Sequence, residues 1–178
     1  RSQWEKFWLV DPLDGTKEFV KRSDEFTVNI ALIHRSRPVV GIVFVPALGH
    51  IYFAAEGLGS YKLEEAELPG HVFFAKKGAS LGGPRMEDLI AEATRLPMHG
   101  TAKRPTDRVN LVGSRSHGTE ALNEFVEKMK ERYNEVKFVP AGSALKLCLV
   151  AEGRADLYPR FGPTMEWDTA AGHCVVEQ

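Results

Sequence analysis

A hydrophobic run that ends abruptly in two acids constrains this chain more than any other feature. Residues 7–10 are apolar and bulky, as expected of a buried strand, and the run stops at Asp11. Pro12 has no backbone N–H and disfavours a helical conformation at the residue before it, so the chain has to turn there. Asp14 follows three residues after Asp11. The sequence therefore predicts a strand that ends in a turn bearing two carboxylates.

The residues after the second acid favour binding of a phosphate. Gly15 can adopt backbone angles that other residues avoid, and Thr16 offers a hydroxyl. We expect a short helix over residues 17–21, so that Gly15 and Thr16 present N–H groups to an anion at its start. The alternative is an Asx-type turn in which Asp14 only caps that helix.

The first half of the chain predicts an antiparallel meander. Four apolar or alternating stretches are expected to be strands, at residues 26–33, 39–45, 50–55 and 61–63. Tight turns rather than helices separate them, which favours antiparallel pairing. Residues 64–108 are expected to form a surface insertion, with a loop at 79–84 and a short amphipathic helix at 86–96.

The second half predicts alternating strands and helices, and hence a second layer of α/β type. The expected strands lie at residues 109–112, 136–139 and 155–158. One helix is expected to begin after a Thr119 cap, a second to span residues 144–152, and a third to begin at Glu166. We therefore predict a mixed α/β (α+β) fold in a single domain over residues 1–178.

Composition and charge exclude several kinds of protein. A hydrophobic content of 43% with 26% charged residues is typical of a globular chain, and a net charge of −1 argues against a nucleic-acid partner. The longest apolar stretch, residues 39–48, is too short to span a bilayer. Cys148 and Cys174 lie far apart in apolar surroundings, which indicates two reduced thiols in a cytoplasmic protein rather than a disulfide.

Three acids are candidates for a metal site that serves phosphate chemistry. Hydrolysis of a phosphate monoester needs positive charge, an aligned water and stabilisation of the leaving oxygen. Asp11 and Asp14 can share Mg²⁺ ions, with the Leu13 carbonyl as a neutral ligand. Asp168, near the start of another helix, is the expected third carboxylate, although it could instead be a helix cap without a metal.

A second group of residues could bind the rest of a substrate. Residues 114–117, which include His117, follow a strand and precede a helix, where α/β proteins often place ligands. Ser143 and Lys146 lie one turn apart at a helix start, and Arg160 adds another cation. Together they indicate a second anionic group on the substrate. The alternatives are that His117 is a loop histidine and Lys146 a surface cation.

The motifs resemble those of a known family. Asp-Pro-Leu-Asp-Gly-Thr at residues 11–16 and Trp-Asp-Thr-Ala-Ala-Gly at 167–172 resemble the paired signatures of the inositol-monophosphatase-like, lithium-sensitive metal phosphatases. Lys-Glu-Phe at residues 17–19 is similar to the bacterial 3′(2′),5′-bisphosphate nucleotidases of the CysQ type, whereas inositol monophosphatases more often carry Asn-Phe there. Residues 114–117, 142–146 and 158–164 also resemble that subfamily.

The resemblance implies a layered α/β/α/β/α sandwich, truncated in this chain. It implies an enzyme that removes the 3′-phosphate of adenosine 3′,5′-bisphosphate, a by-product of sulfate assimilation, to give AMP. Two or three Mg²⁺ ions would be held by Asp11, Asp14, Asp168 and the Leu13 carbonyl. Thr16 would orient the attacking water. The nucleotide would contact His117, Ser143, Lys146 and Arg160.

The resemblance also implies parts that this chain lacks, namely a Glu-bearing metal motif and a water-activating acid ahead of the first strand, and further C-terminal strands. We therefore expect an internal piece of an enzyme that is inactive by itself. We expect the protein to lie in the cytoplasm. Peripheral association with the inner membrane and the oligomeric state are both left open.

Two other functions remain as alternatives. An inositol or sugar-phosphate phosphatase of the same superfamily is disfavoured by Glu18, Lys146 and Arg160. A non-catalytic nucleotide-binding homologue would be expected to lose Asp11, Asp14 or Thr16, but all three are present.

Overall fold

A six-stranded antiparallel sheet forms the first layer of the computed structural model, which describes residues 4–64, 85–98, 107–114 and 119–178. Each strand pairs with its neighbour in sequence, from β1 to β6. The strands are β1 (Lys6–Asp14), β2 (Thr27–His34), β3 (Arg37–Val45), β4 (His50–Ala55), β5 (Gly59–Glu64) and β6 (Thr94–Arg95). The predicted antiparallel meander is therefore confirmed.

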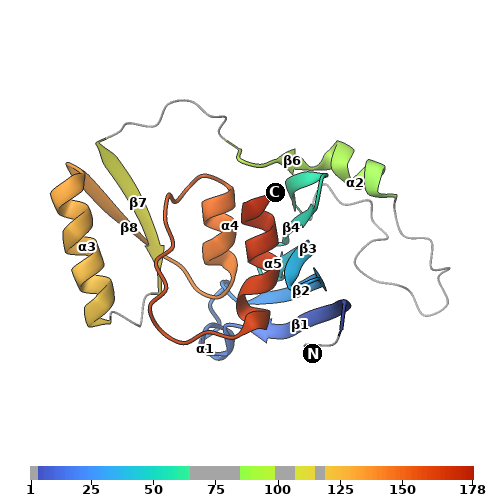
Figure 1. Ribbon diagram of the computed structural model, residues 1–178, viewed down its shortest axis with the longest axis horizontal. Helices are drawn as coiled ribbons and strands as arrows, with labels where there is room; N and C mark the ends of the chain where they lie inside the picture. Colours follow the sequence, from blue (N-terminus) through green and yellow to red (C-terminus); the bar gives the residue numbers. More distant parts are fainter. Residues whose placement is uncertain (1–3, 65–84, 99–106, 115–118) are drawn as a thin grey trace.

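Two helices separate this sheet from a second, smaller one (Figure 1). The helices are α4 (Leu145–Ala151) and α5 (Glu166–Glu177), and the second sheet is the parallel pair β7 (Arg108–Gly113) and β8 (Glu135–Pro140). Helix α3 (Glu120–Arg132) lies beyond that pair, and the expected Thr119 cap is present, because the Thr119 hydroxyl accepts from the Leu122 N–H at 3.2 Å. This order of layers fits the mixed α/β class and the layered sandwich.

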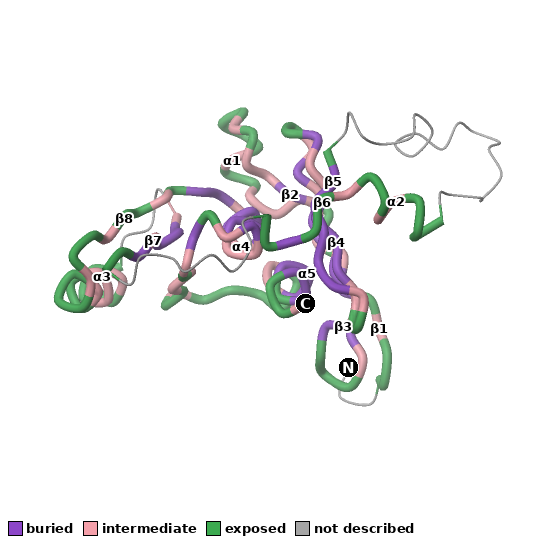
Figure 2. The backbone as a smooth tube through the Cα atoms, turned by 90° about the horizontal axis from the view of Figure 1, so that it is seen from above, coloured by how far each residue is buried: buried purple, intermediate pink, exposed green. Residues whose placement is uncertain are grey.

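Alternation along the strands decides which face of the large sheet the helices cover. In β2 every second residue is buried, and Ala31 and Ile33 belong to the main hydrophobic core. Val43 of β3 and Cys174 of α5 join them in that core. Figure 2 shows the buried backbone concentrated where α4 and α5 meet the sheet. The carboxyl end of β1 is thereby brought beside the starts of both helices.

Strand β3 and helix α5 approach closely because Gly41 has no side chain. A Cβ at this position would overlap the carbonyl oxygen of Ala171 and lie 2.7 Å from the Cys174 Cβ. We expect Gly41→Ala to lower the free energy of unfolding by about 2 kcal/mol, measured by chemical denaturation. Gly162→Ala is the matched control, since a Cβ there would meet nothing within 4 Å. Equal stability of the two variants would contradict this packing.

One expected strand is absent as such, so that prediction was wrong. Residues 155–158 form only an isolated parallel bridge between Leu157 and Leu111. The Asp156 carboxylate accepts the Asn110 N–H at 2.7 Å, so a side chain takes a donor that a longer ladder would use. Pro159, which has no N–H, then prevents extension of the ladder.

The helix expected at residues 86–96 is shorter than predicted. Helix α2 spans Met86–Glu92, and the following residues turn into β6, which pairs with β5. The Leu96 N–H donates to the Ser60 carbonyl, a non-local bond that competes with helix continuation. Leu89 of α2 packs against the outer face of the large sheet. The expected loop at 79–84 lies outside the described residues.

The two cysteines are both free and buried, as the sequence predicts. Along the described stretches of the chain, no helix is both long enough and apolar enough to cross a membrane.

Candidate active site

Three acids from distant parts of the chain meet at one point. Asp11 and Asp14 lie at the carboxyl end of β1, and Asp168 lies in the first turn of α5. One oxygen atom from each carboxylate lies within 4.8 Å of the other two, and all three residues are partly buried. The structure therefore brings together the three carboxylates that the sequence proposes for a metal.

The prediction that the strand ends at Asp11 was wrong, because β1 continues through Pro12 to Asp14, which still pairs with β2. An irregularity near the end of β1 turns the first two acids toward this point. Asp11 pairs with Asn29 of β2, but Asp14 pairs with Thr27, so β1 has one more residue than its partner between these pairs. The Leu13 N–H donates to Asp11 Oδ1 at 3.0 Å, which is an Asx-type turn. The Asx-type turn that the sequence allows as an alternative is thus present at Asp11. This turn orients the Asp11 carboxylate.

Asp14 does not cap the helix that follows it, so that alternative is wrong. Helix α1 (Thr16–Val20) begins after Gly15, which adopts a φ of 82° and gives no side-chain cap. Asp14 Oδ2 instead accepts the Ala144 N–H, at 2.7 Å, from the start of α4. Burial raises the pKa of the Asp14 carboxyl, as does the charge of Asp168, while hydrogen bonds from Asn29 and Ala144 oppose the shift. A bound cation would favour the ionised form.

Asp168 does act as a capping residue, but through one oxygen. Its Oδ2 accepts from the Thr164 hydroxyl and from the Met165 N–H, each at 3.0 Å. Asp11 and Asp14 are likewise held through a single oxygen. Within the described part of the chain, the second oxygen of each carboxylate has no hydrogen bond. Three oriented oxygen donors of this kind fit a hard cation such as Mg²⁺.

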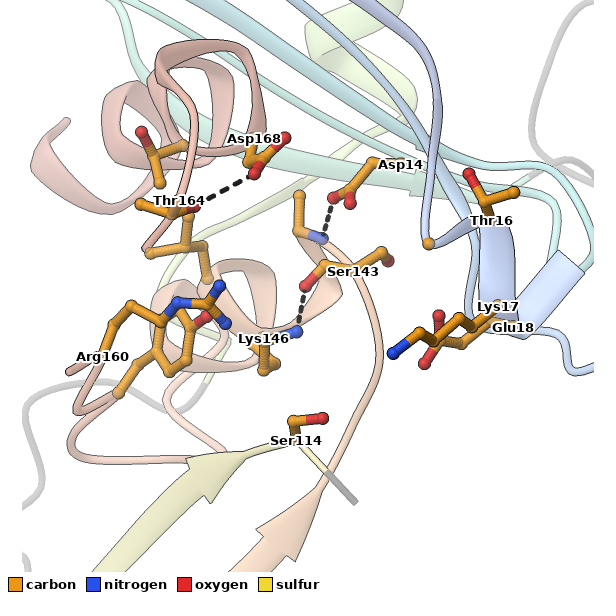
Figure 3. Close-up of a pocket in the computed structure, with 15 residues that line it drawn as sticks. Asp14, Thr16, Lys17, Glu18, Ser114, Ser143, Lys146, Arg160, Thr164 and Asp168 are labelled. Carbon is orange, nitrogen blue, oxygen red and sulfur yellow. Dashed lines mark hydrogen bonds between the residues drawn. The ribbon is translucent and has the colours of Figure 1, made fainter. Parts of the chain in front are cut away.

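A pocket of about 250 Å³ opens beside Asp14 and Asp168. Figure 3 shows these two acids on one side of the pocket and Lys146 and Arg160 across from them. Ser114 at the end of β7 also lines it. The pocket therefore offers a place for a cation next to a place for an anion.

Lys146 is buried, so the alternative of a surface cation is wrong. The residue is 6% exposed, and its ammonium donates to the Ser143 carbonyl at 2.6 Å and lies 5.5 Å from the centre of the Tyr158 ring. Burial lowers the pKa of Lys146, and the Asp14 carboxylate opposes that shift. Arg160 is exposed, and its guanidinium donates to carbonyls of its own loop.

The remaining predicted residues lie at the same pocket or outside the described residues. Gly15, Thr16 and Ser143 all line the pocket. The Thr16 hydroxyl donates to the Leu13 carbonyl at 3.5 Å, the upper limit of a hydrogen bond. His117 lies outside the described residues.

Several residues that hold the acids were missed from the sequence. Thr27 and Asn29 of β2 are buried and donate to Asp14 Oδ2, at 3.4 and 3.3 Å. The sequence did contain a signal for Thr27 and Asn29. Two polar residues at alternate positions of an otherwise apolar strand point to the same buried face, which indicates a buried polar partner. Thr164, which bonds Asp168, lies in the 158–164 motif, but its bond to Asp168 was not predicted.

Comparison with known proteins identifies the family. The sequence model of the inositol monophosphatase family matches residues 2–178. The chain belongs to the inositol monophosphatase family. A relative in this family, the 3′(2′),5′-bisphosphate nucleotidase CysQ of Salmonella typhimurium, is 43% identical over 176 residues. That match covers 99% of this chain and 57% of the relative.

Solved structures of the family have the same fold. CysQ from Bacteroides thetaiotaomicron matches with a TM-score of 0.82 and 43% identity, over 98% of this chain and 59% of that one. SuhB from Mycobacterium tuberculosis matches with a TM-score of 0.66 and 26% identity, over 98% and 60%. The chain therefore spans less than two thirds of the length of these relatives.

Proposed function

We propose that the whole protein carrying this chain is a Mg²⁺-dependent phosphomonoester hydrolase that removes the 3′-phosphate of adenosine 3′,5′-bisphosphate to give AMP. The observation that carries this proposal is the meeting of Asp11, Asp14 and Asp168 beside a pocket that contains Lys146 and Arg160. The acids suit a cation at the phosphate being cleaved, and the two cations suit a second phosphate. The 43% identity to CysQ nucleotidases supports this choice of substrate.

The acid cluster would hold two or three Mg²⁺ ions, with the Leu13 carbonyl as a further ligand. When bound, the metal would supply positive charge that offsets the repulsion between a phosphate dianion and an attacking water. The chain's own contribution is orientation, because hydrogen bonds hold one oxygen of each acid in place.

The remaining residues would bind the substrate. Gly15 and Thr16 would present N–H groups to the phosphate being cleaved, and the Thr16 hydroxyl would orient the water. The nucleotide would be contacted by His117, Ser143, Lys146, Arg160 and, through the metal site, Asp168. Lys146 and Arg160 carry the charge that a second phosphate requires.

Two further proposals concern the chain as a whole. Residues 1–178 would form part of a single phosphatase domain, and the protein would act in the cytoplasm, where the buried free thiols of Cys148 and Cys174 would stay reduced. We expect the isolated 178 residues to be inactive, because they span 57% of the length of the matching CysQ relative. Release of phosphate from adenosine 3′,5′-bisphosphate by this chain with Mg²⁺ would contradict that expectation.

A comparison of substrates tests the proposed function. With Mg²⁺, we expect the whole protein to have a kcat/KM for adenosine 3′,5′-bisphosphate about 100-fold or more above that for inositol 1-phosphate, because only the bisphosphate pairs with both Lys146 and Arg160. Preference for inositol 1-phosphate would support the sugar-phosphate alternative. Absence of turnover with either substrate would support a non-catalytic homologue. Chelation of Mg²⁺ by EDTA is expected to abolish activity.

A further inference from the structure

The turn before α4 contains a strained residue. Ser143 has a φ of 41°, in the left-handed region that residues with a side chain rarely adopt. A conformation of this kind persists only where surrounding contacts hold it. The contacts around Ser143 therefore show what fixes the start of α4.

Glu25 supplies two of these contacts from the segment just before β2. The Gly142 N–H donates to Glu25 Oε2 at 2.9 Å, and the Ser143 hydroxyl donates to the Glu25 backbone carbonyl at 2.7 Å. The two segments touch directly, since a Cβ at Gly142 would lie 3.0 Å from the Glu25 carbonyl oxygen. One residue thus holds two consecutive residues of the strained turn.

The same turn determines where Lys146 points. The Lys146 ammonium donates to the Ser143 carbonyl at 2.6 Å, and the Ala144 N–H donates to Asp14 Oδ2 at 2.7 Å (Figure 3). Because the backbone angles of Ser143 set the direction of its carbonyl, they also set the position of the ammonium. Glu25 bonds the turn at Gly142 and Ser143, and its carboxylate also opposes the lowering of the Lys146 pKa by burial.

We infer that Glu25 is a positioning residue, which holds the turn at residues 142–144 so that the Lys146 ammonium faces the second phosphate of the substrate. Its contribution is specificity for a bisphosphate over a monophosphate. The inference rests on the proposed function, because it assigns Lys146 to that second phosphate.

The test compares Glu25→Ala and Glu25→Gln in the whole protein, on adenosine 3′,5′-bisphosphate and on 3′-AMP, which lacks the second phosphate. We expect Glu25→Ala to raise KM for the bisphosphate about tenfold with kcat within about threefold, and to leave kcat/KM for 3′-AMP within about threefold. Glu25→Gln keeps an acceptor oxygen for Gly142 and should restore KM to within about twofold. Asp24→Ala, which removes a neighbouring exposed carboxylate, is the control and should change neither substrate's kinetics.

A double-mutant cycle separates positioning from a general effect on the fold. If Glu25 acts through Lys146, the double variant Glu25→Ala/Lys146→Met should have a kcat/KM for the bisphosphate less than about twofold below that of Lys146→Met alone. Full additivity, or equal losses on both substrates, would overturn the inference. If Glu25→Ala does not fold, Glu25→Asp, whose shorter side chain withdraws the carboxylate from Gly142, is subject to the same predictions.

The inference and the proposed function can fail separately. If the parent protein does not hydrolyse adenosine 3′,5′-bisphosphate, the proposed function fails and the inference fails with it. If the parent does so and the Glu25→Ala protein keeps the parental KM, only the inference is wrong.

Discussion

Asp14→Asn is expected to lower kcat for adenosine 3′,5′-bisphosphate by about a thousandfold or more in the whole protein. The amide keeps the shape of the carboxylate, and its oxygen can still accept the Ala144 N–H that Asp14 accepts at 2.7 Å. It lacks the negative charge that a cation needs beside Asp11 and Asp168. Steady-state kinetics at saturating Mg²⁺ measure this loss.

The same variant should remain folded, which separates lost chemistry from lost structure. Burial raises the pKa of Asp14, and the charge of Asp168 raises it further, so the ionised group is disfavoured when no cation is bound. In EDTA, the Tm of Asp14→Asn should therefore equal or exceed that of the parent. Asp24→Asn, at an exposed acid away from the cluster, should keep parental activity. Near-normal kcat for Asp14→Asn would show that the metal assignment is wrong.

Glu152→Ala is expected to lower the free energy of unfolding by about 3 kcal/mol or more. Glu152 is 1% exposed and caps the end of α4, where its carboxylate accepts the Tyr52 hydroxyl at 2.7 Å and lies 3.1 Å from the Lys62 ammonium. Both partners are buried and belong to β4 and β5. The substitution leaves a buried hydroxyl and a buried ammonium without this acceptor. Urea unfolding measures the effect.

A surface pair provides the control for this prediction. Glu127 forms an ion pair with Lys130 at 2.8 Å, but both side chains are more than half exposed, so Glu127→Ala should change stability by about 0.5 kcal/mol or less. Equal stability of the two variants would show that the buried pair does not stabilise the fold.

The buried pair should also depend on pH. Burial would raise the pKa of Glu152, but the Tyr52 hydrogen bond and the Lys62 charge together hold it below its usual value. A lowered folded-state pKa gives stabilisation that is present above the unfolded pKa of about 4.3 and is lost as pH falls through the folded value. The difference in stability between parent and Glu152→Ala should therefore be largest near pH 7 and shrink as pH falls below about 4.

Features that depend on neighbouring residues in the chain could be predicted from the sequence. Gly15, with its left-handed φ of 82°, marks the point where β1 gives way to α1, and alternating apolar residues mark β2 and its neighbours. The capping role of Thr119 is equally local. The meeting of Asp168 with Asp14 was expected from its place near a helix start and from the paired family motifs, and no periodicity indicates it.

Features that depend on distant contacts could not be predicted in this way. Asp14 binds the start of α4, 130 residues later, and Glu25 binds the same turn from a third segment. The strand expected at residues 155–158 failed because the Asp156 carboxylate takes the Asn110 N–H, across 46 residues. Each of these bonds needs the folded chain to bring its partners together, and none leaves a pattern in the local sequence.

Identification of the reaction product tests the central claim most directly. Adenosine 3′,5′-bisphosphate is incubated with the whole protein carrying this chain, with Mg²⁺ or with EDTA, and the products are separated by chromatography. The account predicts AMP with its 5′-phosphate intact and one equivalent of inorganic phosphate, formed only with Mg²⁺. Formation of 3′-AMP, or equal turnover in EDTA, would contradict it.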